Sequence, residues 1–338
     1  MHSLRWTLFT LAFTAASAFQ LKAAADEICL CAAEATTNYG HRGFGNSLSD
    51  NAYAENTLPA IEHALNFTDA IEIDIHLTDD GHLLVTHDAT LERLTDQTGC
   101  ALSRPIDELL EIDAGGPHLL GQGLRFPTLD ALLETLDLGL LNIELKLVPE
   151  GAAACEPTDR DALLDLLIPM LEDYDGRAEF IITSFDLEVL VRLRERAPDF
   201  RIGFLSNLPE DIVTAAEAGF EAVNLSAYFL GDLATAVSDA HSRGLELNVW
   251  TVDDPELMRE LIDAGVDGII TNRPDTLETL TAEYCAEDDA PVRCFEEESS
   301  SGGCSATGEA PENFAILAFA LILAMIPRHY IALRRHDR

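Results

Sequence analysis

Basic residues are scarce in this chain of 338 residues. It has 21 lysines and arginines against 60 aspartates and glutamates, a formal net charge of −39, and its only lysines are Lys22 and Lys146. Binding to a nucleic acid backbone requires a basic surface, so this composition argues against a nucleic-acid partner. The excess of acid favours solubility and says little about the fold. The rarity of lysine draws attention to Lys146, which lies in the middle of the chain.

A long apolar run is missing from the N-terminus. The apolar stretch from Trp6 to Phe13 is well short of the roughly 20 residues that cross a bilayer. It follows a His/Arg start and precedes the small residues Ala16, Ser17 and Ala18. This order is typical of a secretory signal peptide, to which we assign residues 1–24. The alternative is a retained membrane helix.

Strand and helix patterns alternate over residues 38–283. Strands are predicted at residues 39–42, 71–77, 141–147, 179–183, 201–204, 222–225, 246–249 and 268–270. Helices are predicted at residues 57–66, 128–136, 160–174, 187–196, 209–218, 230–243, 255–264 and 274–282. Eight such units predict an α/β fold, the (β/α)8 TIM barrel, with a doubly wound open sheet as the alternative. Residues 88–127 interrupt the series as an irregular, glycine-rich stretch with a short helix near residues 105–112.

The cysteines suit an oxidising compartment. There are seven of them, of which six fall between residues 29 and 294, while Cys304 stands alone near the C-terminus. Disulfides persist mainly outside the cytoplasm. Because the ends of a closed barrel lie near each other, we expect Cys29 and Cys31 to bridge to Cys285 and Cys294, and Cys100 to pair with Cys155.

The stretch from Ile71 to Asp88 carries the strongest chemical signal. Its isoleucines alternate with Glu72, Asp74 and His76, which is the period of a β-strand. Two carboxylates on one strand face repel each other unless a cation lies between them. A turn and a second short strand then lead to His87 and Asp88.

Other polar residues follow or occupy strand ends, and in a (β/α)8 barrel these ends form the active site. They are His41 and Arg42 after the first strand, Glu144 and Lys146 on the third, Ser184 after the fourth and Trp250 after the seventh. Glu72, Asp74 and Glu144 together form a hard oxygen set suited to Ca²⁺ or Mg²⁺. Cations beside a metal fit an anionic substrate such as a phosphate. Two histidines supply an acid and a base, so the set is equipped to cleave a phosphodiester.

Several motifs together resemble the glycerophosphodiester phosphodiesterase family. They are HRG at 41–43, ENT at 55–57, EIDIHLTDDGHLLVTHD at 72–88, ELK at 144–146, NVWTVDD from 248 and GVDGIITNRPD ending at 275. The resemblance covers roughly residues 38–283. It implies a (β/α)8 barrel that uses a divalent cation to hydrolyse glycerophosphodiesters to an alcohol and glycerol 3-phosphate, in glycerophospholipid metabolism.

The resemblance also implies roles for individual residues. Metal ligation falls on Glu72, Asp74 and Glu144, acid/base work on His41 and His87, and phosphate contact on Arg42 and Lys146. Glu55 is a ligand or, as we favour, a residue that holds Arg42, and Trp250 lines the substrate mouth. Asp88 is expected to hold a histidine or a turn, and Ser184 to cap a helix. The loop between HRG and ENT is longer than expected for the family, which bears on the alcohol accepted.

The C-terminal part changes character at Cys285. Residues 284–312 are acidic and rich in serine and glycine, which predicts a linker. Residues 313–338 hold the apolar run from Phe314 to Ile326 and an arginine-rich end, which predicts a transmembrane or sorting helix with a cytoplasmic end. Together with Cys304 this tail resembles the C-terminal sorting signals of the myxobacterial type. Processing near Cys304 and a permanent anchor are the alternatives.

The resulting hypothesis is an exported glycerophosphodiester hydrolase in the periplasm or on the cell surface, attached to the membrane through its tail. A lysophospholipase D-type activity on lipid headgroups is the nearest alternative. A noncatalytic surface module that binds a phosphorylated ligand is the alternative from another class. Direct attack by water and a cyclic-phosphate route both remain open.

Overall fold

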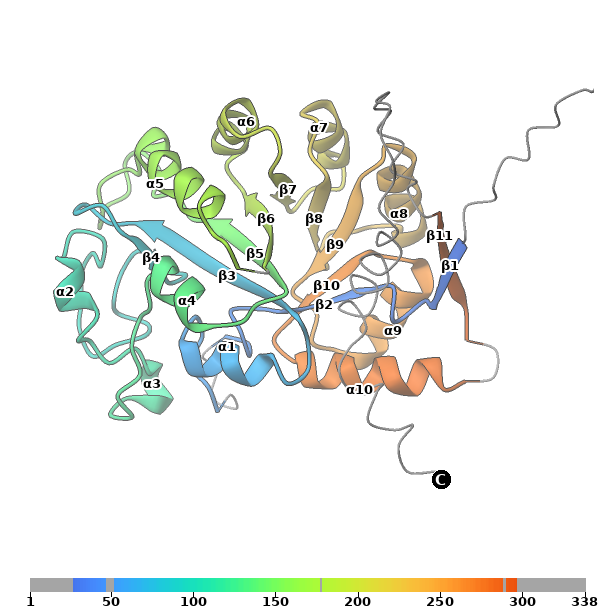
Figure 1. Ribbon diagram of the computed structural model, residues 1–338, viewed down its shortest axis with the longest axis horizontal. Coiled ribbons are helices and arrows are strands. Elements are labelled where there is room, and N and C mark those ends of the chain that lie inside the picture. Colours follow the sequence, from blue (N-terminus) through green and yellow to red (C-terminus); the bar gives the residue numbers. More distant parts are fainter. Residues whose placement is uncertain (1–26, 47–51, 177, 288–289, 297–338) are drawn as a thin grey trace, which may run out of the picture. The chain divides into compact units, whose positions relative to one another are not determined.

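Eight parallel strands close into a barrel in the computed structural model, which describes residues 27–46, 52–176, 178–287 and 290–296. The strand order is closed because β10 pairs with β2 and β2 pairs with β3 (Figure 1). The barrel strands are β2 (Thr37–Gly40), β3 (Ala70–Leu77), β5 (Leu140–Leu145), β6 (Glu179–Ser184), β7 (Arg201–Ser206), β8 (Ala222–Ser226), β9 (Glu246–Trp250) and β10 (Gly268–Thr271). The prediction of a (β/α)8 barrel is therefore confirmed, and the alternative prediction of a doubly wound open sheet is wrong.

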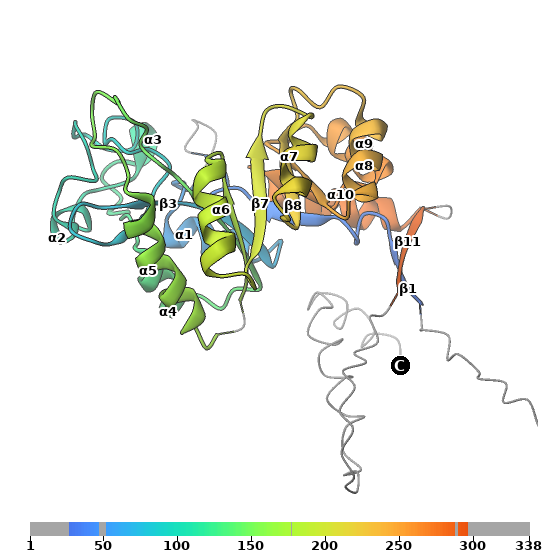
Figure 2. The same cartoon turned by 90° about the horizontal axis from the view of Figure 1, so that it is seen from above.

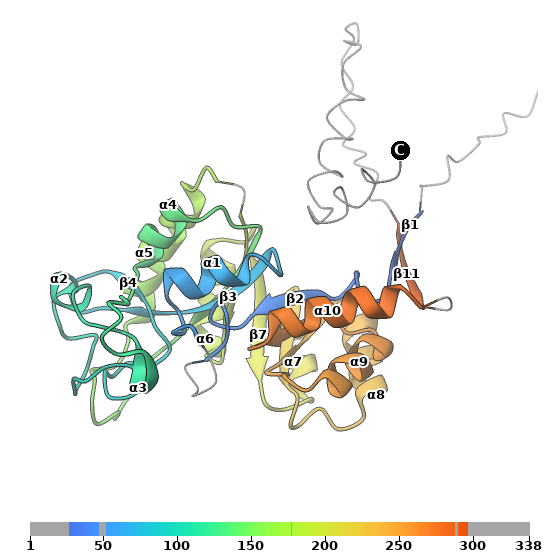
Figure 3. The same cartoon turned by 90° about the horizontal axis from the view of Figure 1, so that it is seen from below.

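Helices follow the strands and cover the outside of the barrel. Figures 1 and 2 show α5, α6 and α7 in succession along one side of the strands, and Figures 1 and 3 show α1 and α10 on the opposite side. These helices are α1 (Leu58–Ala64), α4 (Leu129–Thr135), α5 (Arg160–Glu172), α6 (Leu187–Arg196), α7 (Asp211–Glu217), α8 (Leu233–Ser242), α9 (Pro255–Ala264) and α10 (Pro274–Cys285). Four of them begin at an aspartate whose side chain accepts a backbone N–H of the first turn, which stabilises each helix start.

Side-chain alternation on the strands separates the core from the site. On β3, Ile71, Ile73 and Ile75 are fully buried in the main hydrophobic core. Glu72 and Asp74 lie on the other face of the same strand, since successive side chains of a strand point to opposite sides. The same pattern that buries the isoleucines therefore presents both carboxylates to the barrel interior.

Two predicted strand ends differ from the observed ones. The first strand ends at Gly40, so His41 and Arg42 both follow it. The third ends at Leu145, so Lys146 lies one residue beyond the strand on which it was expected. The Lys146 backbone N–H still donates to the Ile75 carbonyl at 3.0 Å, which continues the pairing of β5 with β3 past the strand end.

The stretch of residues 88–127, expected to be irregular, packs around a small core of its own. The antiparallel strand β4 (Leu83–Val85) follows β3, and the helices α2 (Ile106–Leu109) and α3 (Gly116–Leu119) come after it. Figure 1 shows β4, α2 and α3 near the end at which β3 stops. The residues of this core are Leu84, Leu91, Leu94, Ala101, Leu102, Ile106, Leu109, Ile112, Ala114, Phe126, Val148 and Cys155.

The predicted cysteine pairing is confirmed. Cys100 bonds to Cys155, which links the small core to the loop after β5. Cys31 bonds to Cys285 within the unit of residues 30–293. Cys29 bonds to Cys294 in a second, short unit, and β1 (Glu27–Cys31) pairs with β11 (Val292–Glu296) as a separate two-stranded sheet.

The predicted signal peptide at 1–24, most of the linker at 284–312 and the tail at 313–338 lie outside the described residues. In the ranges that the structure describes, no helix has both the length and the apolar composition needed to cross a membrane.

Candidate active site

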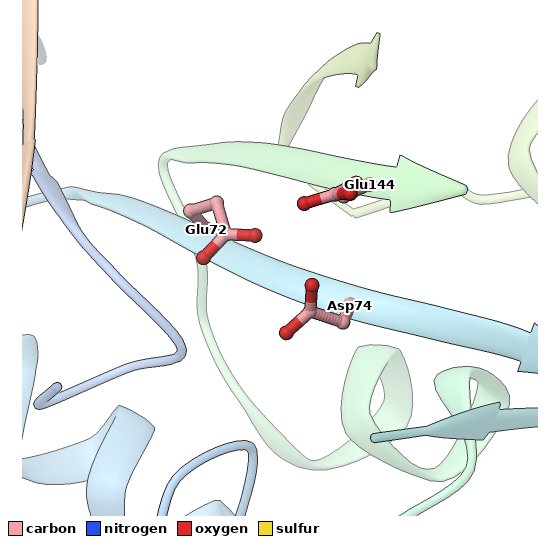
Figure 4. Close-up of side chains that lie close together, drawn as sticks. All are labelled: Glu72, Asp74 and Glu144. Atoms are coloured by element: carbon pink, nitrogen blue, oxygen red, sulfur yellow. The ribbon is translucent and has the colours of Figure 1, made fainter. Parts of the chain in front are cut away.

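Three carboxylates from two neighbouring strands meet on the inner face of the barrel. Glu72 and Asp74 come from β3 and Glu144 from β5, and one oxygen of each lies within 4.8 Å of the others (Figure 4). The register pairs Asp74 directly with Glu144. All three side chains are buried. The spacing predicted from the two strands therefore produces one cluster, and its oxygens are suited to hold a hard divalent cation.

Burial and mutual repulsion disturb the ionisation of this cluster. Burial, together with Asp74 and Glu144, raises the pKa of Glu72 well above its usual range. Burial also raises the pKa of Glu144 to about 7, although Lys146 opposes the shift. Burial acts in the same direction on Asp74, but Lys146 and Arg42 outweigh it and hold the pKa of Asp74 well below its usual range. Two of the three carboxylates thus lack sufficient compensating positive charge in the protein itself, which is the condition that a bound cation relieves.

The two cations predicted to contact phosphate flank the cluster. Lys146 Nζ lies 2.6 Å from Glu144 Oε1 and 3.2 Å from Asp74 Oδ1. Arg42 Nε lies 3.2 Å from Asp74 Oδ2, and its NH1 donates to Glu55 Oε1 at 2.7 Å. Glu55 therefore contacts Arg42, as the favoured alternative predicted, and it is not part of the carboxylate cluster.

The backbone around Arg42 is held in an unusual conformation. Arg42 and Asn56 both have positive φ, 53° and 56°, which is uncommon for residues other than glycine. The Asn56 N–H donates to the Arg42 carbonyl, and its side chain donates to Asp74 Oδ2 at 2.8 Å. The Arg42 N–H in turn donates to Glu72 Oε2 at 2.9 Å. Sequence reasoning missed Asn56, whose position inside the ENT motif was the available signal.

Hydrogen bonds fix the orientation of His41. The Asn272 amide donates to Asp253 Oδ2 at 2.7 Å, so its carbonyl oxygen faces His41 Nδ1, also at 2.7 Å. The Asn46 N–H donates to the same oxygen, which makes it an acceptor, so Nδ1 of His41 carries the hydrogen. The Nε2 lone pair then lies on the side of Glu72, 3.9 Å from Oε2. Burial and Arg42 lower the pKa of His41 to about 4, so the ring is uncharged at neutral pH.

His87 also lines the pocket and has a more open environment. Its Nδ1 lies 2.6 Å from Asp88 Oδ1, which agrees with the predicted holding role of Asp88. The His87 side chain is 32% exposed, against 13% for His41. His76 is buried, and its Nε2 contacts the His87 carbonyl at 3.1 Å.

Arg93 links His87 to Arg42 through two carboxylates and was not predicted. Its two terminal nitrogens donate to the two oxygens of Glu55 at 2.7 Å, and its Nε donates to Asp88 Oδ2 at 2.6 Å. The chain of contacts from His87 through Asp88, Arg93 and Glu55 ends at Arg42. Arg93 lies in the stretch that was expected to be irregular, so no strand period indicated where its side chain points.

These residues surround a pocket of about 250 Å³. Its lining comprises His41, Arg42, Glu72, His87, Asn142, Glu144, Lys146, Thr183, Phe185, Leu205, Trp250, Thr251 and Ile270. Trp250 lines it as expected, with its ring 5.4 Å from that of Phe185 in an edge-to-face contact. Ser184 does not cap a helix: its hydroxyl donates to the Leu145 carbonyl, and Asp186 is the N-cap of α6.

The fold and the site together define a (β/α)8 barrel whose pocket holds a cluster of three carboxylates that could bind a metal ion, two cations beside it and two histidines. The sequence profile of the glycerophosphoryl diester phosphodiesterase family matches residues 41–276. A glycerophosphodiester phosphodiesterase of Caldanaerobacter subterraneus is 34% identical over 249 residues, which cover 71% of this chain and 95% of that protein. The chain belongs to the glycerophosphoryl diester phosphodiesterase family, whose members are phosphoric diester hydrolases.

Solved structures agree with this assignment. A glycerophosphodiester phosphodiesterase of Agrobacterium tumefaciens is 28% identical, with a TM-score of 0.57, and the match covers 72% of this chain and 99% of that one. An Oleispira antarctica phosphodiesterase in complex with its product sn-glycerol-3-phosphate is 23% identical, with a TM-score of 0.61, and it shares the fold over 73% of this chain and 96% of its own.

Proposed function

We propose that this protein hydrolyses glycerophosphodiesters to an alcohol and glycerol 3-phosphate with the help of one divalent cation, Ca²⁺ or Mg²⁺. The observation that carries the proposal is the buried cluster of Glu72, Asp74 and Glu144, with Arg42 and Lys146 against it. A metal held by the three carboxylates would supply positive charge to the phosphate oxygens as negative charge develops on them. Arg42 and Lys146 bind and orient the same phosphate.

The two histidines take different roles in this proposal. His41 presents an unprotonated Nε2 and is held by Asn272, so it accepts the proton of the attacking hydroxyl, whether of water or of the substrate's own glycerol. The new bond joins that oxygen to phosphorus, and the bond from phosphorus to the departing alcohol breaks. On the glycerol route the product of this step is a cyclic phosphate, and water then adds to phosphorus while one bond from phosphorus to a glycerol oxygen breaks, which gives glycerol 3-phosphate. His87 gives its proton to the departing oxygen, and its exposure lets it regain a proton from solvent. Trp250 lines the mouth through which the alcohol leaves.

Removal of the metal is expected to lower the hydrolysis of glycerophosphocholine by at least about a hundredfold, since the cation contributes several kcal/mol of charge stabilisation. Hydrolysis should be measured after EDTA treatment and after separate additions of Ca²⁺ and Mg²⁺. The restoring metal should also raise the melting temperature, by an amount equivalent to about 3 kcal/mol at a hundredfold excess over its Kd. Full activity in EDTA without this shift would contradict the metal assignment. Binding of the diester without turnover in any metal would instead favour the noncatalytic module.

We also propose export and attachment at the cell surface through the C-terminal tail. The three disulfides support an oxidising compartment, and the leader and tail sequences support the route. Cell fractionation of the full chain tests this, and recovery of reduced protein from the cytoplasm would contradict it.

A further inference from the structure

Apolar side chains are concentrated on one half of the barrel mouth. Phe185 follows β6, Leu208 follows β7, and Tyr228 and Phe229 follow β8. Their exposed fractions are 45%, 50%, 87% and 58%, and they make up half of the large exposed apolar residues in the described part of the chain. We call these four residues the apolar rim. Isolated exposed apolar residues are ordinary, but a group on three consecutive loops beside a pocket indicates a binding surface.

The apolar rim is continuous with the pocket through Trp250. The Trp250 ring contacts Phe185, and both residues line the pocket. The Trp250 carbonyl accepts the N–H of Ala227 at 2.7 Å, and Ala227 directly precedes Tyr228 and Phe229. The charged residues that line the pocket, Arg42, Glu72, Glu144 and Lys146, come instead from the loops or ends of β2, β3 and β5. The apolar rim therefore adjoins the part of the pocket that lies opposite these charges in the strand order.

We infer that the substrate carries a hydrocarbon chain, as a lysophospholipid does, which lies on the apolar rim while its phosphate lies against the charged residues of the pocket. This inference rests on the proposed hydrolysis and names its substrate class. The rings of Phe185 and Trp250 would be enough to contact a small cationic headgroup. The apolar rim extends beyond them to Leu208 on the second loop and to Tyr228 and Phe229 on the third. The net charge of −39 opposes adsorption to an anionic membrane, which favours a chain from a single bound molecule.

The reaction on such a substrate is the same hydrolysis. Attack forms one bond from oxygen to phosphorus and breaks the bond to the headgroup alcohol, which takes up the proton. The products are the headgroup alcohol and a lysophosphatidic acid, and the chain remains on the rim until the product leaves.

The test compares lysophosphatidylcholines with chains of six, eight and ten carbons, all below their micelle-forming concentrations, with glycerophosphocholine. Each buried methylene contributes a factor of up to about four, so kcat/KM should rise at least about tenfold from six to ten carbons. The triple variant Leu208→Ser, Tyr228→Ser, Phe229→Ser should abolish this rise and change glycerophosphocholine hydrolysis by less than about twofold. Val191→Ser, at another exposed apolar residue on α6, is the matched control and should behave as the wild type.

The inference would be overturned if kcat/KM of the wild type did not rise with chain length, or if the triple variant kept the same rise. Equal rates of both proteins on the monomeric substrates, with a loss by the triple variant only on zwitterionic vesicles, would assign the rim to a lipid surface and also overturn it. If the wild type hydrolyses glycerophosphocholine but no lysophosphatidylcholine, only this inference fails. If it hydrolyses neither, the proposed function fails.

A separate observation, the contacts of Arg93, carries a second proposal. Glu55 is a fully buried carboxylate that two guanidinium groups share, those of Arg42 and Arg93. Asp88 is likewise shared, between Arg93 and His87. Because the planar guanidinium of Arg93 contacts both carboxylates at once, it fixes the position of Asp88, which contacts His87, relative to Glu55, which contacts Arg42.

We propose that Arg93 is a positioning residue that orients His87 through Asp88, within the proposed hydrolysis. Arg93→Met should lower kcat/KM for glycerophosphocholine about thirtyfold. It should have less than about a threefold effect on a p-nitrophenyl phosphodiester, whose leaving group needs no acid. Arg93→Lys keeps the positive charge but cannot donate to both carboxylates as a planar guanidinium does. Its kcat/KM for glycerophosphocholine should lie between those of Arg93→Met and the wild type. Arg104→Met is the matched control, because Arg104 lies in the same stretch and donates to Gln97 and the Thr98 carbonyl.

A purely structural role would lower both activities equally and would lower the melting temperature. An equal loss on both substrates, or Arg93→Met behaving as Arg104→Met does, would therefore overturn the proposal. A wild type inactive on both substrates would count against the proposed function instead.

Discussion

Glu72→Gln is expected to lower kcat for glycerophosphocholine by about a thousandfold, because the amide keeps the size of the side chain but removes one of the three carboxylates that would hold the proposed cation. The same variant should be more stable than the wild type in EDTA. Glu72 is buried between Asp74 and Glu144, and its charge is costly there without a metal. We expect the free energy of unfolding to rise by about 1–2 kcal/mol.

The pH dependence of stability gives a second readout of this repulsion. Burial, with Asp74, raises the pKa of Glu144 to about 7 in the folded protein, above its ordinary value of 4.5. A folded carboxyl with a raised pKa holds its proton more tightly than the unfolded chain does, so its contribution favours folding at low pH and is lost as the pH rises through 7. The metal-free protein should therefore become more stable between pH 8 and pH 6, and a saturating metal should reduce this trend.

Glu179→Gln is the control for both measurements, since Glu179 is an exposed glutamate at the start of β6. Thermal unfolding in EDTA and steady-state rates in metal would show the opposed effects on stability and activity. Unchanged activity in Glu72→Gln would contradict the cation site, and a loss of stability in EDTA would contradict the repulsion argument.

Substitutions of His41 and His87 should distinguish the base from the acid. His87→Ala should lower kcat/KM for glycerophosphocholine by about a thousandfold, but less than about tenfold for a p-nitrophenyl phosphodiester. His41→Ala should lower both by a comparable factor, of about a thousand, because both reactions need a base. Since the pKa of His41 is lowered to about 4, the wild-type base should remain available at pH 5.5.

Rates on the two substrates, measured in parallel for each variant, decide the assignment. The reverse pattern, with the p-nitrophenyl substrate rescuing His41→Ala, would exchange the two roles. His241→Ala is the matched control, because His241 pairs with Asp267 and does not line the pocket.

Alternation of side chains was enough to predict most of the barrel and its acidic cluster. On β3 the isoleucines must face the core, so Glu72 and Asp74 must face the interior, and the position of Glu144 followed in the same way. The positions of His41, Arg42 and Trp250 followed from the rule that barrel strands end at one mouth. The exact ends of the strands could not be predicted in this way. Lys146, for example, lies one residue beyond β5, although its backbone N–H still pairs with β3.

Contacts between distant segments were not accessible in this way. Arg93 lies in a stretch without strand or helix period, and its contact with Glu55 spans 38 residues. Asn272 and Asp253 orient His41 from the opposite end of the chain, 231 residues from His41 in the case of Asn272. The apolar rim consists of four residues on three loops that no local pattern joins.

The sequence by itself determined the eight strand–helix units and the types of groups at the strand ends, because these depend on local periodicity and on barrel geometry. It indicated disulfides between the two ends of the domain, but the structure decided that Cys29 bonds to Cys294 and Cys31 to Cys285. Only the tertiary structure decided which side chains hold the histidines and arginines in place, and how the charged pocket residues and the apolar rim are arranged around the mouth. These features depend on where loops of irregular conformation fold back, and that is set by packing between segments far apart in the chain.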